Sequence, residues 1–209
     1  MSYLLDEITR VKAVPVLRSA TAEDAIASAR GLAEGGMTVV ELTYSTPGVL
    51  DAIRELSRNG GIRVGAGTIL NQRQAHDAVD AGAEFLVSPV WLPWLPSLAR
   101  SRGVDGIPGA ATPTEIWQAH NFGASAVKVF PIARLGGARY IRDLLAPLPD
   151  LKLMATGGVD VAGASELLAA GCIAVGVGTI STGPDDAEAT HEERARRFLD
   201  AIAAPAARV

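Results

Sequence analysis

Lysine is scarce in this chain, and one lysine stands where covalent chemistry is feasible. Of 19 basic residues, only Lys12, Lys128 and Lys152 are lysines. Lys128 interrupts the apolar run Ala-Val-Lys-Val-Phe-Pro, so strand alternation turns it away from the face that its valine neighbours share. Burying the charged amine of Lys128 in the apolar layer between the sheet and its covering helices would cost free energy. We therefore expect Lys128 to point into an enclosed interior. Loss of hydration there favours the neutral amine, which can attack a carbonyl carbon.

Glu41 is a second charged residue between apolar neighbours, in Val-Val-Glu-Leu-Thr. The alternation argument that applies to Lys128 also turns this carboxylate inward, toward the same space. An amine and a carboxylate in one enclosed site can share proton transfers. A stabilising buried ion pair is the alternative interpretation, and the residue pattern fits both.

Glycine-rich turns late in the chain could hold a phosphate group. Gly157 and Gly158 precede a predicted helix, and Gly178 with Thr179 follows the last β-rich run. Backbone amides exposed at such turns can bind phosphate oxygens. Glycine also ends strands routinely, so the turns alone fit either interpretation.

Two further polar residues follow β-rich runs. Arg18 comes directly after the first run and could pair with a phosphate or a carboxylate, although a plain surface arginine fits equally well. Thr68, in Gly-Ala-Gly-Thr, could donate a hydrogen bond to a substrate carboxylate or simply cap its loop.

The residue types that bind metals are few and badly placed. His76, His120 and His191 fall in helical stretches, and no two of them have the spacing of paired ligands. Cys172 is the single cysteine, so neither an internal disulfide nor a multi-cysteine zinc site can form. We therefore expect no metal.

Repeating β-α units must position these residues. Eight β-rich runs alternate with helical stretches about every two dozen residues. The runs lie at 13–17, 38–44, 62–67, 84–89, 104–109, 125–131, 151–158 and 172–178. Apolar strands covered by helices indicate an all-parallel α/β sheet, and eight units predict a single-domain (β/α)8 TIM barrel over residues 1–209. An open doubly wound sheet is the alternative, but no glycine-rich dinucleotide fingerprint follows the first run.

Capping signals predict where four helices begin. Thr21 with Asp24 and Thr112 with Glu115 have the capping-box form, Asn71 is an N-cap residue, and Thr46-Pro47 has a first-turn proline. In a barrel the active site lies at the carboxyl ends of the strands, which is where the candidate residues fall.

Composition excludes several classes of protein. The net charge of −4 argues against nucleic-acid binding, and 48% hydrophobic residues argue against general disorder. No apolar run approaches the length of a membrane span and no secretory signal is recognisable, so a cytoplasmic protein is expected. Trp91 and Trp94 would line the barrel mouth or form a subunit contact, and we favour the contact.

Seven motifs occur in order along nearly the whole chain. They are VVELTYSTP at 39–47, VGAGTIL at 64–70, LVSP at 86–89, IPGAATPTE at 107–115, VKVFP at 127–131, ATGGV at 155–159 and VGVGT at 175–179. Together they resemble the class I aldolases of the 2-keto-3-deoxy-6-phosphogluconate (KDPG) type, with the related 6-phosphogalactonate and 4-hydroxy-2-oxoglutarate aldolases. The resemblance implies a metal-independent, homotrimeric barrel that uses a covalent lysine imine and no separate cofactor.

The resemblance also implies roles for individual residues. Lys128 would form the Schiff base, and Glu41 would be the acid-base residue. Thr68, Pro89 and the residue at position 45 would lie at the pyruvate. The phosphate of a keto acid phosphate would be held by Gly157, Gly158, Gly178, Thr179 and Arg18. Thr156 and Phe130 would set specificity.

The sequence departs from the family pattern at the site. Many members carry an arginine four residues after the glutamate, where this chain has Ser45. Thr156 is typical of the gluconate-type members. Val90-Trp91 after Pro89, and the isoleucine that follows Phe130-Pro131, also differ from the usual SPG and FPA motifs. We expect these changes to affect substrate preference.

The resemblance predicts cleavage of 2-keto-3-deoxy-6-phosphogluconate to pyruvate and glyceraldehyde 3-phosphate, a step of the Entner–Doudoroff pathway. Preference for the 6-phosphogalactonate or 4-hydroxy-2-oxoglutarate substrates is one alternative. More distant alternatives are a phosphosugar epimerase, which often needs metal-binding histidines, and a non-catalytic phosphoester-binding barrel, for which Ser45 leaves some room.

Overall fold

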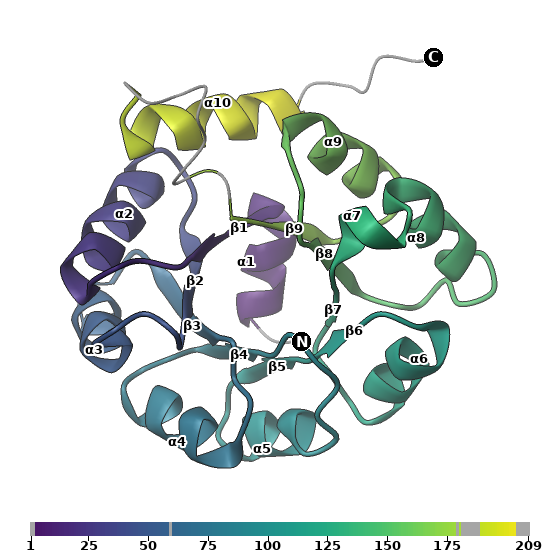
Figure 1. The fold of residues 1–209 in the computed structure, drawn as a ribbon, viewed down its shortest axis with the longest axis horizontal. Coiled ribbons are helices and arrows are strands. Elements are labelled where there is room, and N and C mark those ends of the chain that lie inside the picture. The colour runs from purple at the N-terminus through teal and green to yellow at the C-terminus, as the bar shows by residue number, and fades with distance from the viewer. Residues whose placement is uncertain (1–2, 59, 179, 181–188, 204–209) are drawn as a thin grey trace.

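Each predicted β-rich run contains a strand, and parallel pairing joins the strands in chain order (Figure 1). The computed structural model describes residues 3–58, 60–178, 180 and 189–203. The strands are β1 (Ala13–Leu17), β2 (Val39–Thr43), β3 (Arg63–Gly67), β4 (Phe85–Val87), β5 (Asp105–Ile107), β6 (Gly109–Ala110), β7 (Val127–Val129), β8 (Leu153–Thr156) and β9 (Ala174–Val177).

The sheet curves round on itself. β1 pairs with both β2 and β9, so the first and last strands are neighbours. The fifth predicted run is split at Pro108 into β5 and β6, because proline has no N–H to give to a ladder. The ring continues there through the Lys128 amide, which donates to the Pro108 carbonyl at 2.9 Å. The barrel prediction is confirmed, and the open sheet is wrong.

Helices surround the barrel on its outer face (Figure 1). They are α2 (Ala22–Glu34), α3 (Val49–Arg58), α4 (Gln72–Asp80), α5 (Leu95–Ser101), α6 (Pro113–Asn121), α7 (Ile132–Leu135), α8 (Gly137–Leu145), α9 (Val161–Ala169) and α10 (His191–Ala203). No helix in the described part of the chain is long and apolar enough to cross a membrane. That residues 1–209 form one domain stays a prediction, since both ends lie outside the described residues.

Three of the four predicted helix starts are confirmed by their caps. The side chains of Thr21, Asn71 and Thr112 each accept a backbone N–H from the first turn of the helix that follows. The start at Thr46-Pro47 is wrong, because α3 begins at Val49. Gly48 has a φ of +70°, which a right-handed helix cannot accommodate, so residues 46–48 form a turn instead.

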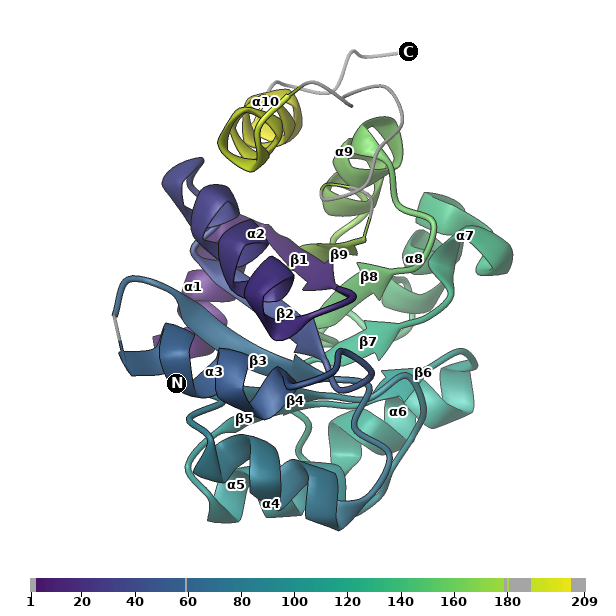
Figure 2. The ribbon, with the colours of Figure 1, turned by 60° about the vertical axis from the view of Figure 1, so that its left-hand side comes forward.

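An additional helix, α1 (Tyr3–Val11), closes the end of the barrel at which the strands begin (Figures 1 and 2). Its Leu4, Leu5 and Ile8 are buried with Val14 and Phe85 in an apolar cluster at this end of the interior. A second, larger core lies between the sheet and the outer helices. The apolar plug leaves the opposite end, where the strands finish, for polar side chains.

Candidate active site

Lys128 and Glu41 meet inside the barrel from β7 and β2, which lie on opposite sides of it. Lys128 is 5% exposed and Glu41 is fully buried. The lysine Nζ lies 3.3 Å from Oε1 and 3.4 Å from Oε2 of the glutamate. The valines on either side of Lys128 belong to the core under the outer helices. The inward direction predicted for both charged residues is confirmed.

Gly67 makes room for the glutamate. A Cβ at residue 67 would collide with the Glu41 carboxylate and its Cγ, so only glycine lets that side chain lie as it does. The register pairs Glu41 with Gly65 and Thr43 with Gly67, which brings the end of β3 against the Glu41 side chain. The sequence reasoning assigned no role to Gly67, although the Gly-Ala-Gly-Thr pattern contained the signal.

Phe130 contacts the lysine, and Thr156 lies two residues beyond Met154, the partner of Lys128 on the neighbouring strand β8. The Phe130 ring centroid is 5.8 Å from the Lys128 Nζ, within the range of a cation–π contact. Gly157 has a φ of +96°, and a Cβ there would lie 2.9 Å from the Phe130 ring. Thr156 is 5% exposed, and its Oγ1 has no hydrogen-bond partner among the described residues. A buried hydroxyl without a partner is costly, so it is available to a polar substrate group.

Arg18 and Ser45 meet at the rim of the site. The register of β1 with β2 pairs Leu17 with Leu42, so Arg18 follows at the level of Thr43. The Arg18 Nη1 donates a hydrogen bond to the Ser45 Oγ. The Ser45 Oγ in turn lies 3.1 Å from the Oγ1 of buried Thr43. Both rim residues are exposed at the mouth of the barrel.

Thr68 and Pro89 follow β3 and β4 at the same mouth, and both are half-buried. Thr68 has a φ of +60°, a left-handed conformation that a non-glycine residue adopts at an energetic cost, often at a functional site. A Cβ at Gly109 would collide with the Pro89 backbone, so that glycine permits the close approach of the β4 loop. The structure thus brings both predicted pyruvate-binding residues to the mouth.

The predicted phosphate-binding glycines also lie at this end. Gly157 and Gly158 follow β8 with φ values of +96° and +73°, and the Gly157 carbonyl accepts the Ala133 amide at 3.1 Å. Gly178 follows β9 and is exposed. Thr179 lies outside the described residues.

The other two lysines are far from this mouth. Lys12 precedes β1 and Lys152 precedes β8, so both lie at the end where the strands begin. The histidines lie in helices α4, α6 and α10, also as predicted. Over the described ranges, no three His, Cys, Asp or Glu side chains gather in a way that could hold a metal ion.

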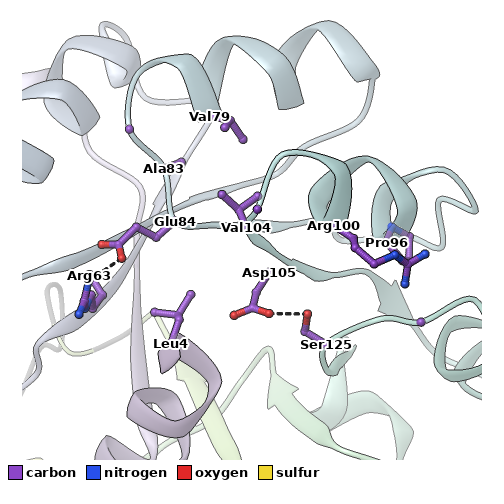
Figure 3. A pocket seen from close by; sticks show the side chains of 13 residues that line it. Leu4, Arg63, Val79, Ala83, Glu84, Pro96, Arg100, Val104, Asp105 and Ser125 are labelled. Carbon is purple, nitrogen blue, oxygen red and sulfur yellow. Dashed lines mark hydrogen bonds and ion pairs between the residues drawn. The ribbon is translucent and has the colours of Figure 1, made fainter. Parts of the chain in front are cut away.

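A cavity of about 660 Å³ lies at the end of the barrel that α1 covers, and Leu4 of that helix is among its lining residues (Figure 3). Its walls include an ion pair between Arg63 and Glu84, 2.7 Å long, and the Ser125 hydroxyl, which donates to Asp105 at 2.6 Å. These residues lie at or just before strand beginnings, where barrel enzymes do not place their chemistry. The candidate active site is therefore the polar mouth at the other end, around Lys128 and Glu41.

Trp91 and Trp94 are half-buried, and both pack against the core under the outer helices. The Trp91 ring meets the Phe122 ring edge-on, with centroids 5.5 Å apart. The subunit contact predicted for these tryptophans stays a prediction.

A buried amine facing a buried carboxylate inside a parallel barrel is the arrangement that a lysine-dependent aldolase, a class of lyase, requires. A family model described as "KDPG and KHG aldolase" matches residues 5–194. The chain is also 36% identical over 170 residues to the 2-dehydro-3-deoxy-phosphogluconate aldolase of Treponema pallidum, with 81% of each chain covered. The chain belongs to the KDPG and KHG aldolase family.

Two solved structures bear on its chemistry and assembly. KDPG aldolase from Legionella pneumophila, with pyruvate captured as a covalent carbinolamine, is 28% identical with a TM-score of 0.80, over 91% of this chain and 93% of that one. A carbinolamine precedes an imine, which supports covalent chemistry without a separate cofactor. A cage designed by fusing symmetric oligomeric domains is 27% identical with a TM-score of 0.79, over 92% of this chain and 70% of that one.

Proposed function

We propose that this enzyme cleaves 2-keto-3-deoxy-6-phosphogluconate to pyruvate and glyceraldehyde 3-phosphate through a Schiff base on Lys128. The observation that carries the proposal is the buried contact between Lys128 and Glu41, 3.3 Å long, inside the barrel. Family membership supports the reaction class. The names of the relatives support the gluconate-derived substrate.

The geometry supports a complete proton balance. Glu41 takes a proton from the Lys128 ammonium, and the neutral amine attacks C2 of the keto acid. A proton then moves from the attacking nitrogen to the former carbonyl oxygen, which gives the carbinolamine. Glu41 returns the proton as the carbinolamine hydroxyl leaves as water, which gives an iminium ion. The carboxylate then removes the C4 hydroxyl proton, the C3–C4 bond breaks, and its electron pair moves into the iminium to form an enamine. Protonation at C3 and hydrolysis of the imine release pyruvate and restore Lys128.

The other mouth residues would hold the two ends of the substrate. Thr68 and Pro89 flank the pyruvate portion, where Thr68 can donate to the carboxylate. Amides of Gly157, Gly158 and Gly178 would hold the phosphate. Thr179 is proposed for the same role from the family resemblance alone.

Specificity would come from two side chains near the mouth on β8 and after β7. The Thr156 hydroxyl, which has no hydrogen-bond partner in the described part of the chain, would bond a substrate hydroxyl and so distinguish the gluconate from the galactonate series. The Phe130 ring would form the apolar wall near the reacting carbon.

Borohydride trapping tests the proposed function. The protein is incubated with pyruvate and sodium borohydride, and peptide mass spectrometry locates the reduced adduct. We expect one adduct on Lys128, abolished in Lys128→Ala and kept in the matched control Lys152→Ala. An adduct elsewhere, or none, contradicts the mechanism. A pyruvate-release assay with the gluconate-derived, galactonate-derived and unphosphorylated keto acids then identifies the preferred substrate.

We also propose that the enzyme is a cytoplasmic homotrimer that acts in the Entner–Doudoroff pathway. Exposed apolar side chains support an assembly, since Phe122 is 54% and Trp117 45% exposed on or next to α6, and Val90 is 47% exposed on the nearby loop after β4. The neighbour built from symmetric oligomeric domains also supports it. Light scattering should give three times the 21.6 kDa chain mass, and Trp117→Glu should lower it. A monomeric wild type contradicts this proposal.

A further inference from the structure

We propose that Arg134, on α7, binds the phosphate of the substrate and supplies a positive charge that the glycine turn after β8 lacks. Arg134 lies outside the seven motifs that carry the family resemblance, so that resemblance assigns it no role. The inference rests on the proposed function, because it presumes a phosphorylated keto acid whose phosphate lies at Gly157 and Gly158.

The single-turn helix α7 packs directly on this glycine turn. The Ala133 amide donates to the Gly157 carbonyl at 3.1 Å. A Cβ at Gly158 would lie 2.7 Å from the Ala133 Cβ, so only glycine permits this close contact. Figures 1 and 2 show α7 beyond the end of β8, on the side of the barrel where the strands finish. Arg134 therefore follows, by one residue, the point at which α7 contacts the proposed phosphate site.

The helical repeat places Arg134 on the face of α7 that is turned away from the core. Ile132 is 1% exposed, and Leu135 packs against the core under the outer helices, so these two residues form the inner face of the turn. Successive residues of a helix are rotated by about 100°, which puts Ala133 and Arg134 on the opposite face. Ala133 contacts the glycine turn from that face, and Arg134 is exposed beside it.

The Arg134 guanidinium is available to a ligand. It has no hydrogen bond or ion pair with any residue that the structure describes. In contrast, Arg18, to which the resemblance also gives a phosphate role, already donates to Ser45. The carboxylate of Asp160, which follows the glycine turn closely, accepts the Gly163 amide at 2.8 Å as the N-cap of α9. An arginine side chain is long enough to reach back past Ala133 to the turn.

The chemistry of a phosphate monoester favours a cation beside these glycines. Near neutral pH the phosphate carries almost two negative charges. Backbone amides bind its oxygens but are neutral, and a hydrogen bond from a charged donor is roughly twice as strong. The net charge of −4 on the whole chain also opposes the approach of a dianion. A guanidinium beside the turn offsets this repulsion and can bind two phosphate oxygens at once.

Two keto acids that differ only in the phosphate test this role. Pyruvate release from 2-keto-3-deoxy-6-phosphogluconate and from 2-keto-3-deoxygluconate is measured for wild type, Arg134→Gln and Arg134→Lys. The matched control is Arg100→Gln, which removes an exposed arginine that lines the cavity at the closed end and changes the net charge equally.

Arg134→Gln should lower kcat/KM for the phosphorylated substrate about tenfold or more, because a charge-assisted hydrogen bond is lost. It should leave kcat/KM for the unphosphorylated substrate unchanged. Arg134→Lys keeps the charge and should recover part of the loss. The control should match wild type with both substrates.

Pyruvate provides a second readout, since it has no phosphate. The pyruvate concentration that half-saturates borohydride trapping should be the same in wild type and Arg134→Gln. A higher concentration in the variant would place Arg134 at the pyruvate end of the site and overturn the inference.

The outcomes distinguish this inference from the function on which it rests. If wild type traps pyruvate on Lys128 but Arg134→Gln cleaves the phosphorylated substrate normally, the inference is overturned and the lysine mechanism stands. Equal losses with both keto acids would also overturn it, because the phosphate would not be the group that Arg134 contacts. If wild type forms no adduct, the proposed function fails and the inference with it. Arg134 is exposed, so its variants should unfold at the wild-type temperature.

Discussion

The Glu41 carboxylate occupies the space that a side chain at Gly67 would fill. This relationship joins β2 to β3 inside the barrel and fixes the distance from the carboxylate to the Lys128 amine. The proposed acid-base residue is thus oriented by the absence of a side chain on the neighbouring strand. If Glu41 has that role, catalysis depends on a glycine that takes no part in the chemistry.

Gly67→Ala should therefore damage the active site more than the fold. The added methyl group would push the glutamate away from Lys128, and misplacement by about 1 Å can cost about 10²-fold in rate. Steady-state kinetics and circular dichroism check this. Gly163→Ala, in the first turn of α9, is the control and should keep normal activity. Full activity in Gly67→Ala would show that the Glu41 carboxylate can reach its position beside Lys128 even with a side chain at residue 67.

Glu41→Gln should separate imine formation from turnover. The amide keeps the shape of the side chain but cannot accept the C4 hydroxyl proton, so kcat should fall by about 10²- to 10⁴-fold. The pyruvate adduct should still form with borohydride, more slowly, because the amine remains. Glu84→Gln removes a carboxylate at the closed end and should keep normal kcat. A Glu41→Gln enzyme with normal kcat would leave the glutamate with a purely structural role.

Strand alternation was sufficient to predict that Lys128 and Glu41 point into the barrel, for a definite physical reason. A charged residue between apolar neighbours on a covered strand can avoid the helix layer only by pointing inward, and Lys128 and Glu41 both do so. The sequence also predicted the barrel, because eight evenly spaced apolar runs covered by helices favour a closed parallel sheet, and the dinucleotide fingerprint of the open alternative is missing.

Features that depend on contacts between distant elements were not predictable in this way. The close approach of Gly67 to Glu41 and the bond from Arg18 to Ser45 appear only when neighbouring strands are in register. The helix α1 was missed because its apolar face is buried only by contact with the interior residues at the closed end of the barrel, which are distant in sequence. Pro108 splits the fifth strand through a missing N–H, which a count of apolar residues does not detect.

The α1 plug should contribute stability without affecting catalysis. Ile8 is 1% exposed in the apolar cluster at the closed end, so Ile8→Ala should lower the free energy of unfolding by about 2–5 kcal/mol. Urea unfolding measures this, and KM should not change because the active site is at the other end. Thr9→Ala, on the exposed side of α1, should cost much less. Equal costs for the two variants would mean that α1 does not plug the barrel in solution.

The single cysteine should be inert in the native protein. Burial raises the pKa of the Cys172 thiol to about 12. At pH 8 the thiolate fraction is then about one in 10⁴, and the thiolate is the reactive species. Ellman's reagent should release no colour from native enzyme and one equivalent after denaturation. Rapid reaction of the native protein would contradict the burial of this thiol.

Acid should weaken the packing of α10 on α2 through His191. A Cβ at Gly31 of α2 would lie 2.8 Å from the His191 Cβ, so the histidine is packed closely against that helix. Burial, with the charge of Arg194, lowers the pKa of His191 below its usual 6.5. Between the folded pKa and 6.5 the unfolded chain binds more protons than the folded one, so the free energy of unfolding falls as pH drops through this window. Wild type and His191→Gln are compared by thermal unfolding from pH 7.5 to 5.5, where the glutamine variant should lose less stability. Parallel pH profiles would show that protonation of His191 has no part in acid destabilisation.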